Sequence, residues 1–126
     1  MDMRTPLKKV RGLGSAKEGT HHFWVQRMTA VALVPLFVLF IIFIIAHIGA
    51  PYEEVVASLS NPFIAVLMGL MIVAGLVHMR IGMLEIIDDY VHGEVLKLVA
   101  VMANTFFTVL IGGLCLFAIL KIAFVG

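Results

Sequence analysis

One apolar stretch, GLVHMRIGMLEIIDDYVH from Gly75 to His92, holds the ionisable side chains best placed to do chemistry. At the 100° per residue of an α-helix, His78, Glu85 and Asp89 lie on one face. An imidazole and two carboxylates in such a row suit metal coordination through the imidazole or proton transfer along the face. Within a membrane each ionisable group costs about 2.5 to 3.5 kcal/mol, so a function or a partner is expected for them.

The expected depth of His78 in the membrane limits the roles that its imidazole can have. In a helix centred near Gly75, the imidazole lies about 4 to 5 Å from the membrane midplane, where it must contact a neighbouring helix or a metal. Gly75 and Gly82, about one turn away on either side, leave space that suits a haem coordinated by the imidazole. Small residues at this spacing also let two helices pack closely, with His78 hydrogen-bonded across the contact. Zinc and non-haem iron fit less well, since no second His or Cys lies at ligand spacing on this face.

The stretch ends in Asp88, Asp89 and Tyr90, about 18 Å along the helix axis from His78. A phenol O–H beside carboxylates suits a quinone carbonyl, which needs a hydrogen bond and protons. The alternative is a tyrosine of the membrane interface at a solvated helix end. Arg80 points away from His78, and we expect it to pair with a partner chain or a lipid headgroup.

A second polar cluster, HHFWVQRMTA, opens an earlier apolar run. Its guanidinium, Arg27, suits carboxylates, including the propionates of a haem. His21 and His22 stand just before the apolar run, where neighbouring histidines are more often surface residues than ligands. All three are expected on the same side of the membrane as the end of the first stretch.

The whole chain has the composition of a membrane protein. Of its 126 residues, 62% are hydrophobic and 13% are charged, a balance outside that of soluble domains. Apolar runs near residues 24–48, 62–88 and 95–124 each exceed the roughly 20 residues that span a bilayer, and three segments cannot close a barrel. We therefore predict an all-α fold in one membrane-anchor domain, residues 1–126, with a leader over residues 1–23 and three transmembrane helices.

The positions of Lys and Arg predict the orientation. Basic residues gather before the first run, whereas the connection over residues 49–61 holds two Glu and no base, so the N-terminus is expected in the cytoplasm. The first run is too long for a cleaved signal. The leader lacks a transit-peptide composition, which favours a bacterial protein of the inner (cytoplasmic) membrane or an already processed one. A formal net charge of +1 gives no reason to expect nucleic-acid binding. The single cysteine, Cys115, is expected to serve packing.

Both polar motifs resemble those of a known family. HMRIGMLEIIDDYVHG is similar to the signature around the haem ligand in the smaller hydrophobic membrane anchor of succinate dehydrogenase (succinate:quinone oxidoreductase, respiratory complex II): His, three residues, Gly, apolar residues, then Asp-Tyr-Val. HHFWVQRMTAVAL is similar to that family's His, five residues and Arg. The resemblance covers nearly the whole chain and implies three spans in a helical bundle shared with a second anchor subunit.

The resemblance also implies roles for the matching positions. His78 stands where the family places an axial ligand of haem b. Tyr90 stands where it places a hydrogen-bond donor to the quinone, and Asp89 where it places the neighbouring acid. Arg27 and His21 stand where relatives have polar groups near the haem propionates and the quinone pocket.

Cofactors and partners are implied in the same way. The haem b would be shared with a second cytochrome b anchor subunit, and ubiquinone would be the substrate. A flavoprotein subunit and an iron–sulfur subunit would deliver electrons from succinate in the tricarboxylic acid cycle, so this chain would catalyse nothing alone. Two positions depart from the pattern: Arg80 stands where an apolar or aromatic residue is expected, and Asp88 precedes the usual Asp.

Two other functions stay open. His78, Glu85 and Asp89 would form a relay in a small transporter or proton-conducting subunit. A haem-free anchor, of a related fumarate reductase or an assembly factor, would need His78 only as a hydrogen-bond partner of a neighbouring helix.

Overall fold

The computed structural model describes residues 14–125, with side chains from residue 20 onward, and it confirms the all-α fold. No strand occurs in this range. Three of the helices are long and apolar enough to cross a membrane, as the sequence predicts. The helices are α2 (Gly14–Ala46), α3 (Tyr52–Leu59), α4 (Pro62–Tyr90) and α5 (Glu94–Phe124).

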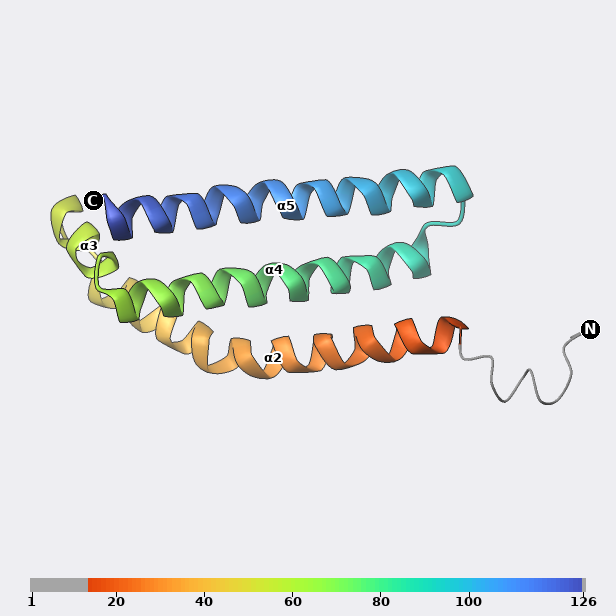
Figure 1. Cartoon of the computed structure of the whole chain (residues 1–126), viewed down its shortest axis with the longest axis horizontal. Helices are drawn as coiled ribbons and strands as arrows, with labels where there is room; N and C mark the ends of the chain where they lie inside the picture. The colour runs from red at the N-terminus through yellow and green to blue at the C-terminus, as the bar shows by residue number, and fades with distance from the viewer. Residues whose placement is uncertain (1–13, 126) are drawn as a thin grey trace, which may run out of the picture.

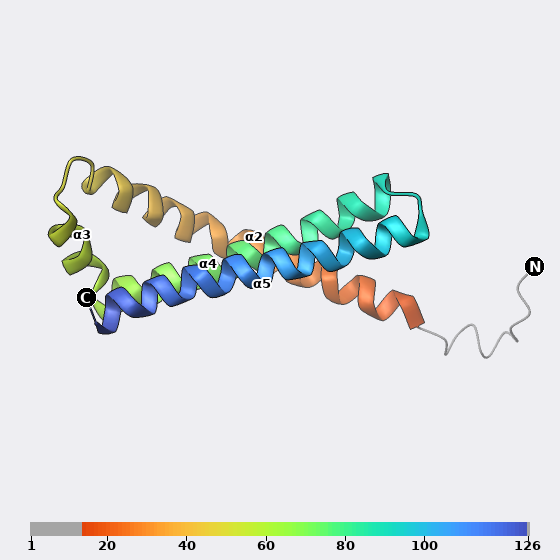
Figure 2. The same cartoon turned by 90° about the horizontal axis from the view of Figure 1, so that it is seen from above.

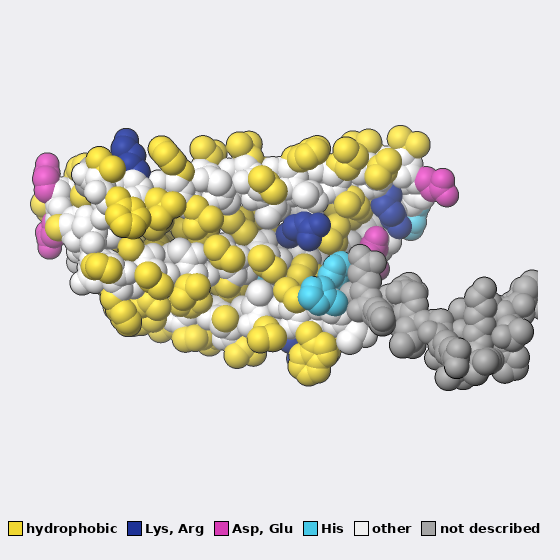
Figure 3. Space-filling view, in the orientation of Figure 1, with side chains coloured by type: hydrophobic (Ala, Val, Ile, Leu, Met, Phe, Trp, Pro, Cys, Tyr) yellow, Lys and Arg dark blue, Asp and Glu magenta, His cyan; other side chains and the backbone are white. Residues whose placement is uncertain are grey.

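The three long helices form a layer one helix thick. α4 lies between α2 and α5 and packs against both, while α2 and α5 share no contact in the described chain (Figure 1). α4 and α5 run alongside each other, whereas α2 crosses them (Figure 2). Among the described residues, the buried apolar side chains are Ile81 and Ile87, both on α4. Most apolar side chains therefore face outward (Figure 3), toward lipid or a partner subunit.

Two parts of the chain are more helical than the sequence indicates. α2 begins at Gly14, so residues 14–23 of the predicted leader are helical, while residues 1–13 lie outside the described range. A helix satisfies its own backbone hydrogen bonds and need not stop where the hydrocarbon does. The connection over residues 49–61 contains α3, whose first turn carries Glu53 and Glu54. Carboxylates there interact favourably with the positive end of the helix dipole.

Local signals set the helix ends and the bend. Asn61 caps α4: its side-chain oxygen accepts from the backbone N–H of Phe63 at 2.9 Å, and Pro62 takes the first helical position, where no N–H is needed. Gly49 turns the chain out of α2 with φ 78°, a backbone conformation that glycine adopts without strain. Pro35 lies inside α2 and removes one hydrogen bond of the helix, and α2 curves along its length (Figure 1).

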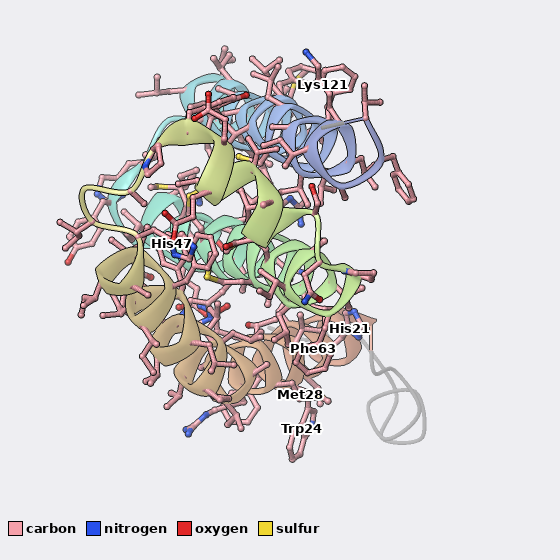
Figure 4. The ribbon with its side chains drawn as sticks, turned by 90° about the vertical axis from the view of Figure 1, so that its left-hand side faces the viewer. His21, Trp24, Met28, His47, Phe63 and Lys121 are labelled. Carbon is pink, nitrogen blue, oxygen red and sulfur yellow. The ribbon has the colours of Figure 1, made fainter. Side chains whose placement is uncertain are left out.

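Hydrogen bonds hold α3 across the end of the layer. His47 lies in the space between α2, α3 and α4 (Figure 4), with Nδ1 2.7 Å from the carbonyl oxygen of Phe43 and Nε2 2.7 Å from Ser58 Oγ. Since Nδ1–H donates to the carbonyl, Nε2 accepts from the serine hydroxyl. Ser60 Oγ in turn donates to the carbonyl oxygen of Ile122 on α5 at 3.1 Å. The connection is therefore tied to both outer helices.

Candidate functional site

His78 lies in the contact between α4 and α2 and is partly buried there. Its Nδ1 is 3.1 Å from the hydroxyl oxygen of Thr29 on α2. Its Nε2 makes no hydrogen bond to any residue of the described range. Among the described residues, the imidazole is thus hydrogen-bonded across the helix contact through Nδ1 alone.

The two glycines beside His78 let α2 approach α4. A Cβ on Gly75 would lie 3.8 Å from Leu33 Cδ2, and a Cβ on Gly82 would lie 3.4 Å from Gln26 Nε2. Side chains of α2 therefore fill the space next to both glycines, as close helix packing requires. A role for Gly75 and Gly82 in packing a haem stays a prediction.

Tyr90 and Asp89 end α4 and are both exposed, Tyr90 with 75% of its surface accessible. Within the described residues the tyrosine hydroxyl makes no hydrogen bond. An ion pair joins Asp88 Oδ1, near the end of α4, to Lys97 Nζ at the start of α5, with 3.9 Å between the two atoms. Because these side chains are 69% and 40% exposed, the pair contributes little to stability. The described part of the chain supplies polar groups at this end of α4 and leaves them exposed.

Arg27 and His21 do not reach His78 within this chain. The guanidinium of Arg27 lies over the ring of Phe23, 5.0 Å from its centroid. Two residues make 200° on a helix, so Arg27 faces away from the side of α2 on which Thr29 contacts α4. His21 is exposed beside His22, with ring centroids 6.2 Å apart. Their predicted approach to haem propionates or a quinone stays untested.

Comparison with known proteins places the chain in a family. Residues 1–112 match the model of the succinate dehydrogenase/fumarate reductase transmembrane subunit. The chain belongs to this family. It is 36% identical over 102 residues to the succinate dehydrogenase hydrophobic membrane anchor subunit of Paracoccus denitrificans, covering 81% of this chain and 79% of that protein. The corresponding subunit of Rickettsia bellii is 28% identical over 109 residues, 86% of this chain and 87% of its own length.

A third relative, the succinate dehydrogenase membrane anchor subunit of Reclinomonas americana, is 34% identical over 88 residues, 68% of this chain and 73% of its own. The chain is therefore a multi-pass membrane-anchor subunit of succinate dehydrogenase, in agreement with the resemblance of its two motifs.

Sequence reasoning missed the polar residues through which the neighbouring helices of this anchor subunit contact α4. Thr29 bonds the imidazole of His78, and Asn104 Nδ2 on α5 donates to the backbone carbonyl oxygen of Arg80 at 3.1 Å. A signal for the first contact exists, since Gln26 and Thr29 are polar residues three apart at the start of an apolar run and share a helix face. Because the partner of that face cannot be known from periodicity, its contact with His78 was not predicted.

Proposed function

We propose that this anchor subunit supplies one axial ligand of a haem b through His78 Nε2 and forms part of a ubiquinone-reduction site through Tyr90 and Asp89. The observation that carries the haem assignment is the one-sided hydrogen bonding of His78, whose Nδ1 is engaged by Thr29 while Nε2 has no partner in the described chain. Histidines that bind metals almost always use one ring nitrogen for the metal and the other for a hydrogen bond.

The fold leaves room for the remaining half of such a site. Because the described helices form a single layer, residues 14–125 leave one side of α4 uncovered, and a second anchor subunit can contribute the other axial ligand there. His47 lies just past the end of α2, and its two ring nitrogens are already 2.7 Å from the Phe43 carbonyl oxygen and from Ser58 Oγ. A bound haem b supplies reversible one-electron transfer, at a potential set by its ligands and surroundings.

The exposed end of α4 suits a quinone shared with other subunits. The Tyr90 hydroxyl can donate a hydrogen bond to a quinone carbonyl, and the neighbouring Asp89 carboxylate can hold a proton for it. Electrons would arrive from succinate through a flavoprotein subunit and an iron–sulfur subunit. We infer that these partners dock at this end of the layer, on the cytoplasmic face of a bacterial inner membrane.

A proton relay along α4 has less support. His78 and Glu85 are about 10 Å apart along the helix axis, and neither bonds to the other or to Asp89 in the described chain. A relay has no chromophore, so the visible spectrum of the purified complex separates it from the haem proposal.

Replacement of His78 tests the haem proposal. In the complex purified in mild detergent, we expect His78→Leu to lose or shift the haem b bands of the reduced-minus-oxidised spectrum. His47→Leu, which removes the histidine at the other end of the layer, is the matched control and should leave the bands unchanged. An unaltered spectrum in the His78 variant would instead show that His78 does not ligate the haem, and would leave it only the hydrogen bond to Thr29.

Replacement of Tyr90 tests the quinone proposal. Tyr90→Phe removes one hydrogen bond, about 1 kcal/mol or roughly a fivefold change, so ubiquinone reduction should fall while succinate oxidation by an artificial electron acceptor continues. Tyr52→Phe is the control, since Tyr52 is similarly exposed at 72% but belongs to α3 at the other end. Equal loss of both activities in the Tyr90 variant would contradict a quinone role.

A further inference from the structure

We infer that Thr29 is a positioning residue for His78: its hydroxyl accepts the Nδ1–H, which fixes the tautomer and leaves the lone pair on Nε2. The effect on haem b rests on the proposed function above, whereas the tautomer itself does not. Thr29 stands in the second motif, HHFWVQRMTAVAL, and lies on α2, a different helix from the ligand.

The hydrogen-bond geometry of the threonine determines the direction of the bond. Thr29 Oγ1 is 2.9 Å from the carbonyl oxygen of Val25 and 3.1 Å from that of Gln26, both one turn earlier on α2. Carbonyl oxygens only accept, and a hydroxyl has a single hydrogen, so that hydrogen is directed to the α2 backbone. Toward His78 Nδ1, 3.1 Å away, the hydroxyl presents a lone pair. The imidazole must therefore donate, with its hydrogen on Nδ1.

The glycines explain how the hydroxyl comes within reach. Gly75 and Gly82 stand on either side of His78 on α4, and the places of their missing side chains are taken by Leu33 and Gln26 of α2. This close approach puts Thr29 between these two contacts and opposite the imidazole. A histidine flanked by glycines can therefore leave space for a haem, and it also lets α2 pack closely against α4.

The hydrogen bond changes how His78 can bind a metal. A neutral imidazole whose Nδ1–H is donated has a fixed ring orientation and is more basic at Nε2. A more basic ligand favours the higher oxidation state of the metal that it binds. We therefore expect Thr29 to lower the reduction potential of a haem ligated by His78 and to strengthen its retention.

The test uses three variants of the intact complex. Thr29→Val keeps the shape of the side chain and removes the hydroxyl, whereas Thr29→Ser keeps the hydroxyl. Thr108→Val is the matched control, because Thr108 makes the same type of bond to its own helix, 2.8 Å to the carbonyl oxygen of Asn104, and makes no hydrogen bond to a histidine among the described residues. Haem content per complex, the midpoint potential and the electron paramagnetic resonance spectrum of the oxidised haem are measured for each.

We expect Thr29→Val to raise the midpoint potential, to shift the resonance spectrum and to weaken haem retention by about 10- to 100-fold. Thr29→Ser should restore the three properties, and Thr108→Val should match the unmodified complex. A Thr29→Val complex that assembles with unchanged potential, spectrum and retention would overturn the role of Thr29 toward the metal.

A measurement on the full chain without haem keeps the two proposals apart. Nitrogen-15 resonances of histidine-labelled chain in detergent micelles, assigned with His78→Leu, report which ring nitrogen carries the hydrogen. We expect the Nδ1–H form, replaced by a mixture in Thr29→Val. The Nε2–H form in the unmodified chain would refute the inference, even if His78→Leu shows that this residue ligates the haem. Conversely, an Nδ1–H form in a complex without haem b would defeat only the proposed function.

Discussion

The contact between α5 and α4 depends on the absence of one side chain, and adjacent glycines allow that dependence to be measured. Gly112 is buried against α4: a Cβ there would lie 3.0 Å from Leu76 Cδ1. Gly113 is exposed, and a Cβ there would lie within 4 Å of no other helix and of no side chain beyond its chain neighbours. Substituting Val at each position makes the same chemical change at neighbouring sites of one helix, once against α4 and once away from it.

The expected magnitude follows from these distances. Ordinary van der Waals contact lies at 3.4 to 4 Å, so a Cβ alone already requires the end of Leu76 to move. The two further methyl groups of Val extend about 1.5 Å beyond the Cβ, and the displaced atoms belong to a packed helix contact. Overpacking of this kind costs about 1 to 3 kcal/mol. Changes in intrinsic helix propensity are shared by Gly112→Val and Gly113→Val and cancel in the comparison.

The assay is an SDS titration of the purified chain in mixed micelles, followed by circular dichroism. We expect Gly112→Val to be less stable than Gly113→Val by about 1 to 3 kcal/mol, roughly a 5- to 150-fold difference in the unfolding equilibrium constant. Gly112→Ala should be less stable than Gly113→Ala by a smaller amount, because only the flexible end of Leu76 must shift and the gain in helix propensity is the same at both positions. Equal stability of the two Val variants would refute the packing of α5 on α4 through Gly112.

Three other substitutions probe the connections between helices. Gly49→Ala should lower the free energy of unfolding by about 1 kcal/mol in the same titration, since φ 78° is strained for a residue with a Cβ. His47→Leu leaves the Ser58 hydroxyl without its 2.7 Å partner, and proteolysis between α2 and α3 should be faster; an unchanged cleavage rate would show that this bond does not hold α3. Asn104→Leu removes the bond to the Arg80 carbonyl oxygen and should cost about 0.6 kcal/mol, measured by SDS titration, and a loss above about 2 kcal/mol would contradict this estimate.

Membership in the anchor-subunit family and the number of spans were accessible from the sequence. Each span is a local property, because a helix in lipid satisfies its backbone within the segment and needs only length and apolar composition. The motif around His78 was accessible for the same reason, since the spacing of His, Gly, Asp and Tyr lies within one helix. The helix α3 was missed because eight residues carry too little periodicity to separate a short helix from a loop.

The sequence by itself therefore determined the fold class and predicted for His78 a depth at which an imidazole needs a partner. Only the tertiary structure decided which partner it meets. The contact with Thr29 joins positions 49 residues apart and depends on how α2 crosses α4. At that crossing, Leu33 and Gln26 of α2 pack beside the two glycines that flank His78, a relation between helices that no periodicity within one helix contains.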